Sequence, residues 1–145
     1  MKTLQTLIRV HQWHLEEKRR TVVEIEAERE RIKAKIERLE REIAAEKLFL
    51  AQQVDDQYRM VALDFSHYHE EAQLRRGDIL LELKFNGEKL EAAMVEVTIA
   101  YQELKKYEIA LEQRLRREAL IAAQKEQIKL DDLAIEGFRR RGMGV

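Results

Sequence analysis

The chain has 145 residues with no proline, no cysteine and five glycines, so it carries few of the residues that interrupt helices. Charged residues make up 38% and aromatic residues only 6%, a mixture typical of a long coiled coil and not of a compact core. The 27 basic and 28 acidic residues are interspersed and give a net charge of −1, which argues against a nucleic-acid partner. The lack of cysteine excludes disulfides and thiolate metal sites.

Residues 1–10 alternate polar and apolar side chains and contain no continuous apolar segment. Such a pattern is that of neither a signal peptide nor a membrane span. We therefore expect a helix from the start of the chain, no direct membrane insertion and a cytoplasmic location.

A row of mostly aliphatic residues, spaced alternately by four and three, runs along the first part of the chain. Spacing of this kind keeps one stripe against a partner helix in a left-handed supercoil. We interpret the polar members of the row as residues that set the register between helices. The row consists of Leu4, Ile8, His11, Leu15, Lys18, Val22, Ile25, Arg29, Ile32, Ile36, Leu39, Ile43, Glu46 and Leu50.

Beyond Leu50 the row advances by successive four-residue steps, which shifts the stripe by about one residue. This shift predicts a straighter or looser stretch over residues 46–58. The alternative is a helix end near Gln52 and Gln53, although no glycine or proline marks one there. The continued row consists of Val54, Tyr58, Val61, Phe65, Tyr68 and Ala72.

The strongest signal for a reversal is Arg75-Arg76-Gly77-Asp78, because glycine can end a helix and aspartate can cap the next one. We predict a first arm over residues 3–74, a turn at 75–78 and a second arm over 79–140. Asn86-Gly87 is the competing break, although the apolar residues around it favour a helix that tolerates one glycine.

A second row begins at Leu90 and again alternates steps of four and three before it becomes less regular. Two rows on either side of one turn bury each other if the arms fold together. We therefore predict an all-α fold in which two long helices form an intramolecular antiparallel coiled-coil hairpin over residues 1–145. The second row consists of Leu90, Met94, Val97, Tyr101, Leu104, Glu108, Leu111 and Leu115, then Ile121, Ile128, Leu133, Ile135 and Phe138.

Residues that could carry catalysis or bind a metal are sparse. His11 and His14 lack matching carboxylates, and His67 and His69 point to different faces of a helix. The chain contains no glycine-rich phosphate loop, no nucleophile elbow and no zinc-hydrolase signature. We expect a protein that is not an enzyme and has no cofactor and no metal.

Candidate protein-binding residues are the rings that lie off the first and second rows, namely Trp13, Phe49 and Tyr107. The cluster Arg139–Arg141 could engage an acidic partner or an anionic membrane surface, or it could simply favour the end of the helix through the macrodipole. Singly exposed rings are common, so a purely structural interpretation of these residues stays open.

Three segments carry a likeness to a known family, namely the opening Lys2–Arg9, the segment Tyr101–Glu108 and the ending from Leu130-Asp131-Asp132 through Phe138–Arg141. On these segments the chain resembles the FliJ family of flagellar type III export proteins, and the resemblance covers essentially the whole chain. The resemblance implies a coiled coil similar to the γ stalk of rotary ATP synthases, seated in a hexameric export ATPase. It also implies contacts with the export-gate membrane protein FlhA and with export chaperones, at the inner membrane of the flagellar base.

In such a stalk the end that carries both termini enters the ATPase, whereas the part of the hairpin nearer the turn meets the gate. The first group of residues is Leu4, Ile8, Phe138, Arg139, Arg140 and Arg141, and the second is Tyr58, Phe65, Tyr68 and Phe85. We expect a monomer. The alternative function is a self-associating structural scaffold or tether, and an injectisome in place of a flagellum also stays open.

Overall fold

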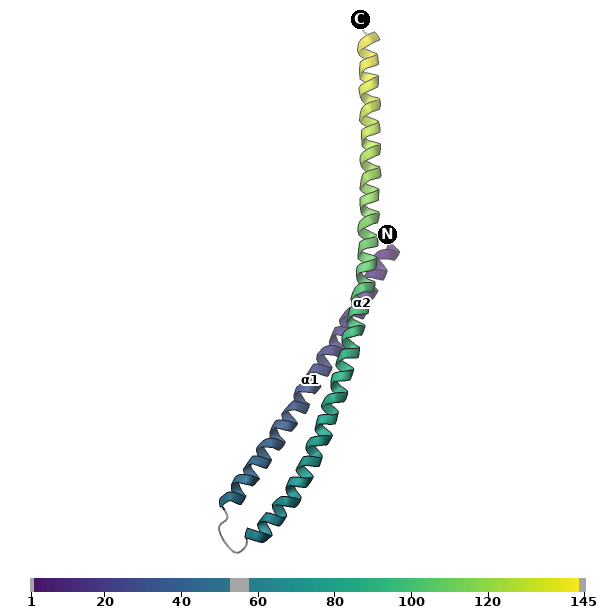
Figure 1. Cartoon of the computed structure of the whole chain (residues 1–145). Helices are drawn as coiled ribbons and strands as arrows, with labels where there is room; N and C mark the ends of the chain where they lie inside the picture. Colours follow the sequence, from purple (N-terminus) through teal and green to yellow (C-terminus); the bar gives the residue numbers. More distant parts are fainter. Residues whose placement is uncertain (1, 53–57, 144–145) are drawn as a thin grey trace. The chain divides into compact units, whose positions relative to one another are not determined.

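A computed structural model describes residues 2–52 and 58–143, with the side chains of residues 58–63 and 143 left aside. The described residues form helix α1, Lys2–Gln52, and helix α2, Tyr58–Met143 (Figure 1). No β-strand occurs within these two ranges, so the predicted all-α class is confirmed.

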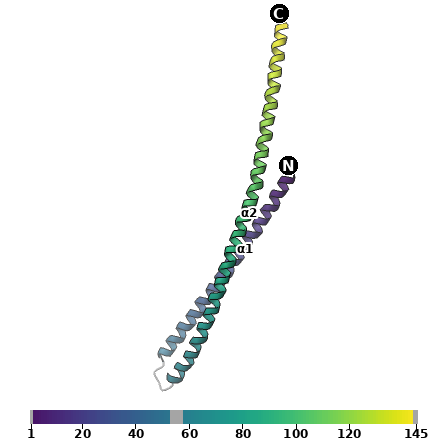
Figure 2. The ribbon, with the colours of Figure 1, turned by 45° about the vertical axis from the view of Figure 1, so that its right-hand side comes forward.

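Both helices contribute to two compact units. The hairpin unit comprises Leu15–Ile99, and the terminal unit comprises Met1–His14 with Ala100–Val145. In the hairpin unit α1 and α2 run side by side in opposite directions (Figures 1 and 2). Ion pairs join Lys18 to Glu96 at 3.3 Å and Lys35 to Glu82 at 3.7 Å, so partner numbers on α2 fall as those on α1 rise. The predicted intramolecular antiparallel hairpin is therefore confirmed.

The core of the hairpin unit is a narrow seam between the helices. Leu15, Ile32, Leu39 and Ile43 are buried on α1, and all of them belong to the row that the 3-4 spacing predicts. Burial of each such aliphatic side chain contributes about 1.5–3 kcal/mol. The tightest part of the seam is the cluster of Leu39, Ile43 and Ala72, against which Tyr68 and Ile79 pack.

The predicted turn at residues 75–78 is wrong, because α2 passes through it without interruption. Gly77 has no positive φ, and a Cβ added there would meet no atom within 4 Å. The register of the helices also excludes a reversal at Gly77, since Lys18 pairs with Glu96 and Lys35 with Glu82. The alternative helix end near Gln52 is confirmed, while residues 53–57, where much of the predicted looser stretch falls, lie outside the described residues.

The competing break at Asn86-Gly87 is also continuous helix. Asn86 is only 3% exposed, and its Nδ2 donates a hydrogen bond to the carbonyl oxygen of Ile25 at 3.1 Å. A Cβ added at Gly87 would lie 3.3 Å from Nη1 of Arg29, so the glycine leaves room for this arginine beside the seam. The dipeptide therefore serves packing between the helices and makes no turn.

The terminal unit contains a short stretch of helix pairing followed by a single helix. Leu104 is buried, and Tyr107 stacks on His11 of α1 with ring centroids 4.7 Å apart. Residues 112–142 of α2 are then exposed throughout except for half-buried Gly137. We call residues 112–142 the C-terminal extension. The two arms were predicted to be of similar length, which is wrong, because α1 has 51 residues and α2 has 86.

Neither helix, over its described residues, contains an apolar stretch long enough to cross a membrane.

Candidate functional site

The described residues include no group of three or more metal-ligating side chains placed to hold an ion. The pKa of Lys105 is raised because its Nζ donates a hydrogen bond to Glu108 at 3.0 Å, with further attraction from the Glu108 charge. Lys105 is exposed and Glu108 is only half-buried, and ion pairs this close to solvent stabilise little. The geometry of the described side chains therefore directs attention to surfaces that another protein could contact.

An aromatic cluster lies in the terminal unit. His11 stacks on Tyr107, His14 lies 6.0 Å from His11, and Trp13 meets the ring of His14 edge-on at 5.3 Å. Trp13 is 59% exposed, as its position off the row predicts. Tyr107 was also predicted to be exposed, but it is half-buried because it packs on His11.

The C-terminal extension is an exposed surface of the terminal unit. Phe138 is 79% exposed, the highest value among the large apolar side chains described. Next to it, Arg140 forms an ion pair with Glu136 at 3.4 Å, whereas Arg139 and Arg141 have no ion pair with another described residue. The other exposed large apolar residues of the extension are Leu115, Leu120, Ile121, Ile128, Leu130, Leu133 and Ile135.

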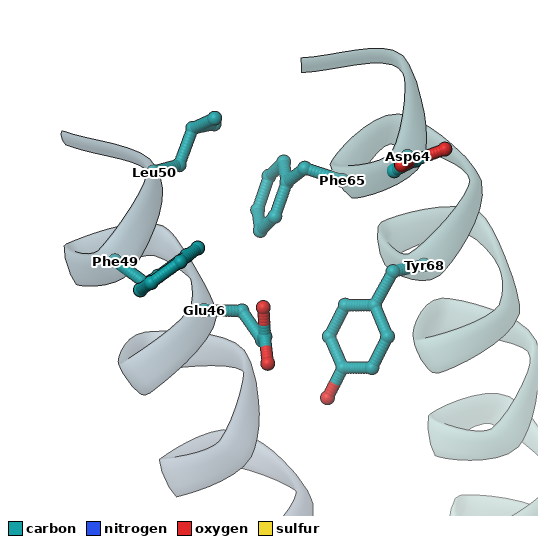
Figure 3. A pocket seen from close by; sticks show the side chains of 6 residues that line it. All are labelled: Glu46, Phe49, Leu50, Asp64, Phe65 and Tyr68. Atoms are coloured by element: carbon teal, nitrogen blue, oxygen red, sulfur yellow. The ribbon is translucent and has the colours of Figure 1, made fainter. Parts of the chain in front are cut away.

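A second site lies between the last turns of α1 and the early turns of α2 in the hairpin unit. An open cavity of about 300 Å³ separates α1 from α2 there (Figure 3). We call it the hairpin-end notch. The notch is lined by Glu46, Phe49 and Leu50 of α1 and by Asp64, Phe65 and Tyr68 of α2.

The structure brings together only some of the predicted contact residues. Phe49, Phe65 and Tyr68 share the hairpin-end notch, and Phe49 is exposed at 53%, as predicted. Phe85 is exposed but does not line the notch. The side chain of Tyr58 lies outside those described.

The expected grouping of Leu4 and Ile8 with Phe138 is not one surface. Leu4 and Ile8 are half-buried on α1. About one turn further along α1, His11 stacks on Tyr107. Since the helices are antiparallel, Leu4 lies about two turns of α2 beyond Tyr107. Phe138 and Arg139–Arg141 follow several turns later, on the extension alone.

Glu46 and Asp64 were not predicted as members of a site. The available signal was the acidic residue Glu46 within an otherwise aliphatic part of the first row, which sequence reasoning assigned to register. Which residues of α2 lie opposite Glu46 depends on where the chain reverses. Because the reversal was predicted at Gly77, the sequence did not predict the notch.

The fold and these surfaces define a class of protein, the antiparallel two-helix coiled-coil hairpin with a single-helix extension. Comparison with protein-family models, with curated proteins and with solved structures gives no match to the chain.

Proposed function

We propose that this protein is a non-enzymatic, stalk-like coiled coil of the flagellar type III export apparatus, similar to the FliJ family. In this proposal it binds the hexameric export ATPase through the terminal unit, binds the export gate through the hairpin unit and assists flagellar assembly. The single observation that carries the proposal is the C-terminal extension, which continues α2 well past the residues that pair with α1.

The extension supports a stalk because an isolated helix of this kind is poorly stabilised by itself. Residues 112–142 span roughly 45 Å at about 1.5 Å per residue. Helices in water depend mainly on packing of an apolar face, yet here Ile121, Ile128 and Ile135 face solvent. Large exposed apolar surfaces of soluble proteins commonly mark contact sites. A ring-shaped partner would cover such a helix on all sides at once.

The charges near Phe138 favour a protein partner with acidic groups. Arg139 and Arg141 have no ion pair among the described residues, and arginine binds carboxylates through two parallel hydrogen bonds. An apolar ring beside cationic side chains is a composition typical of binding hot spots. The resemblance in sequence assigns this end of the chain to the ATPase.

The remaining parts of the proposal rest on the resemblance and on the notch. Contact with FlhA and transient handling of export chaperones would take place at the hairpin unit, where Phe49, Phe65 and Tyr68 gather. The protein would then act on the cytoplasmic side, peripherally associated with the inner membrane at the flagellar base.

A self-associating scaffold is the second candidate, and Ile121, Ile128 and Ile135 favour it because they recur every seven residues. Charge opposes it. An antiparallel pair of extensions centred on Ile128 would place Arg117 opposite Arg139, and a parallel pair would place each arginine cluster against its copy. Like charges held this close repel each other. We therefore favour the monomeric stalk.

The test is ATP turnover by the purified cognate export ATPase with and without the protein. We expect the wild-type chain to stimulate turnover and the variant with Arg139, Arg140 and Arg141 changed to alanine to stimulate it less. The matched control changes Arg31, Arg38 and Arg41 to alanine, because these arginines are exposed on α1 of the hairpin unit. Loss of stimulation in both variants, or in neither, would contradict contact through the extension.

A further inference from the structure

The hairpin-end notch contains a carboxylate at a position of the first row that directly follows the aliphatic run from Ile32 to Ile43. Next to the notch, on the side away from the end of α1, the seam is filled by Ile43 and by Ala72, which is 0% exposed. Three residues after Ile43, the same row of α1 presents Glu46. Figure 3 shows Glu46 extending into the gap between the helices, on the side where Phe65 and Tyr68 extend from α2.

Glu46 is exposed where it lines the notch. Among the described residues, Glu46 forms no ion pair and no side-chain hydrogen bond, although nearby Glu40 pairs with Arg76 at 3.5 Å. A carboxylate buried without a partner costs several kcal/mol, on the order of the stabilisation from the core around it. Closing the helices over Glu46 would carry this cost, whereas the cavity of about 300 Å³ beside it leaves the residue exposed.

Aromatic rings form the rest of the wall. Phe65 lies 6.5 Å from Tyr68 and 5.8 Å from His69, with the Phe65 and His69 rings stacked. Phe49 and Leu50 face these rings from α1 (Figure 3). The faces of phenyl and phenol rings attract cations through their quadrupole. Ring faces and a carboxylate around one cavity are complementary to a cationic side chain with an apolar stem.

We propose that the hairpin-end notch binds an arginine side chain of a partner protein. The guanidinium stacks on the ring of Phe65 or Tyr68 and donates hydrogen bonds to the carboxylate of Glu46, while its aliphatic stem packs against Phe49 and Leu50. Arginine suits the notch better than lysine because its planar group stacks on rings and sheds water more readily. The volume lies at the low end for ligand pockets, which fits one side chain and not a cofactor.

This inference rests on the proposed function only for the expectation that the hairpin unit meets another protein, and it adds the chemistry of that contact. Asp64 also lines the notch and adds a second negative charge to it. Its charge would attract the cation during approach, whereas Glu46 would hold it.

The test uses the full chain with labelled phenylalanine and tyrosine rings, observed by nuclear magnetic resonance. The probe is the peptide acetyl-Ala-Leu-Arg-Leu-Ala-amide, and its control is the same peptide with citrulline, a neutral isostere, in place of arginine. We expect saturable shifts of the Phe49, Phe65 and Tyr68 rings with the arginine peptide. The citrulline peptide should bind about tenfold more weakly or less, since it lacks the charge. Equal binding of both peptides, or no saturable shift, would overturn the proposal.

Two variants locate the site. Glu46→Gln should weaken binding of the arginine peptide by about tenfold, because it removes the charge and keeps the shape of the side chain. Glu37→Gln is the matched control, an exposed carboxylate on α1 that does not line the notch, and should bind as the wild type does. Circular dichroism checks that both variants are as helical as the wild type. Equal weakening of peptide binding in the two variants would contradict the proposed site.

A dilution series of the chain without peptide tests the other occupant, a second copy. Ring shifts of Phe49 and Phe65 that change with protein concentration would mean that a second copy fills the notch, and the proposal would fall. Shifts independent of concentration are expected. No ATPase takes part in these measurements, so their failure would remove the arginine site and leave the contact of the extension with the ATPase to its own test.

Discussion

Asn86 of α2 donates a hydrogen bond from Nδ2 to the carbonyl oxygen of Ile25 on α1, across the seam, at 3.1 Å. The Asn86 side chain is almost wholly buried, and its Oδ1 has no hydrogen-bond partner among the described residues. A slip of one helix past the other would bury this amide against aliphatic side chains without its acceptor. Single polar residues of this kind fix register at a cost in stability.

The first prediction follows from that half-satisfied amide. Asn86→Leu should leave the free energy of unfolding unchanged or raise it by about 1 kcal/mol, since it removes a buried unpaired oxygen and adds apolar contact. The same change should loosen the register, which would appear as increased self-association in sedimentation at high concentration. Thermal unfolding followed by circular dichroism measures the stability. A loss of several kcal/mol would show that the hydrogen bond itself holds the helices together.

The second prediction distinguishes a helix from a turn at Gly77. Because Gly77 lies within α2 and an added Cβ would meet nothing within 4 Å, Gly77→Ala should stabilise the protein by about 0.5–1 kcal/mol. A glycine in the left-handed conformation of a turn would respond in the opposite direction. Gly87→Ala should gain less, since its Cβ would press on Arg29 at 3.3 Å. Urea unfolding of both variants measures the difference.

The third prediction concerns the buried cluster of Leu39, Ile43 and Ala72. Ala72 is completely buried in the cluster with Leu39 and Ile43, so Ala72→Leu should destabilise the protein by about 1–3 kcal/mol through overpacking. The control is Ala92→Leu, because Ala92 is exposed on the same helix and should change stability little. If the two substitutions had equal effects on the midpoint of urea unfolding, the seam would not lie where the structure places it.

The buried face of α1 could be predicted from the sequence, whereas the reversal could not. Leu15, Ile32, Leu39 and Ile43 follow directly from the 3-4 spacing, which is a property of one helix alone. The position of the reversal depends on which residues of the two helices lie opposite each other, as Lys35 lies opposite Glu82, with which it forms an ion pair. No glycine or proline marks the end of α1 at Gln52, so local signals pointed to Gly77 instead.

The candidate sites were also predictable only where they depend on one helix and not on how the two helices pair. Exposure of Trp13 and Phe49 follows from their places off the row, and the structure confirms it. Tyr107 was misjudged because its burial comes from the opposing ring of His11. The hairpin-end notch required the pairing of Glu46 with Phe65 and Tyr68, which sequence spacing within one arm does not contain.

The fourth prediction separates the fold from the extension. A chain that ends at Leu115 should unfold at the same temperature as the full chain, because the described residues removed, 116–142, are exposed apart from half-buried Gly137. Its helical signal in circular dichroism should fall in proportion to the residues removed. A marked drop in the unfolding temperature would mean that the extension folds back on the hairpin unit or on another copy.

The measurement that tests the central claim most directly is the stimulation of the cognate export ATPase by the full chain and by the chain that ends at Leu115. If the extension is the part of the stalk that binds the ATPase, the full chain raises ATP turnover and the shortened chain, still folded, leaves it at the basal rate. Equal stimulation by both chains would contradict the claim that the extension makes this contact, and no stimulation by either would contradict the stalk itself.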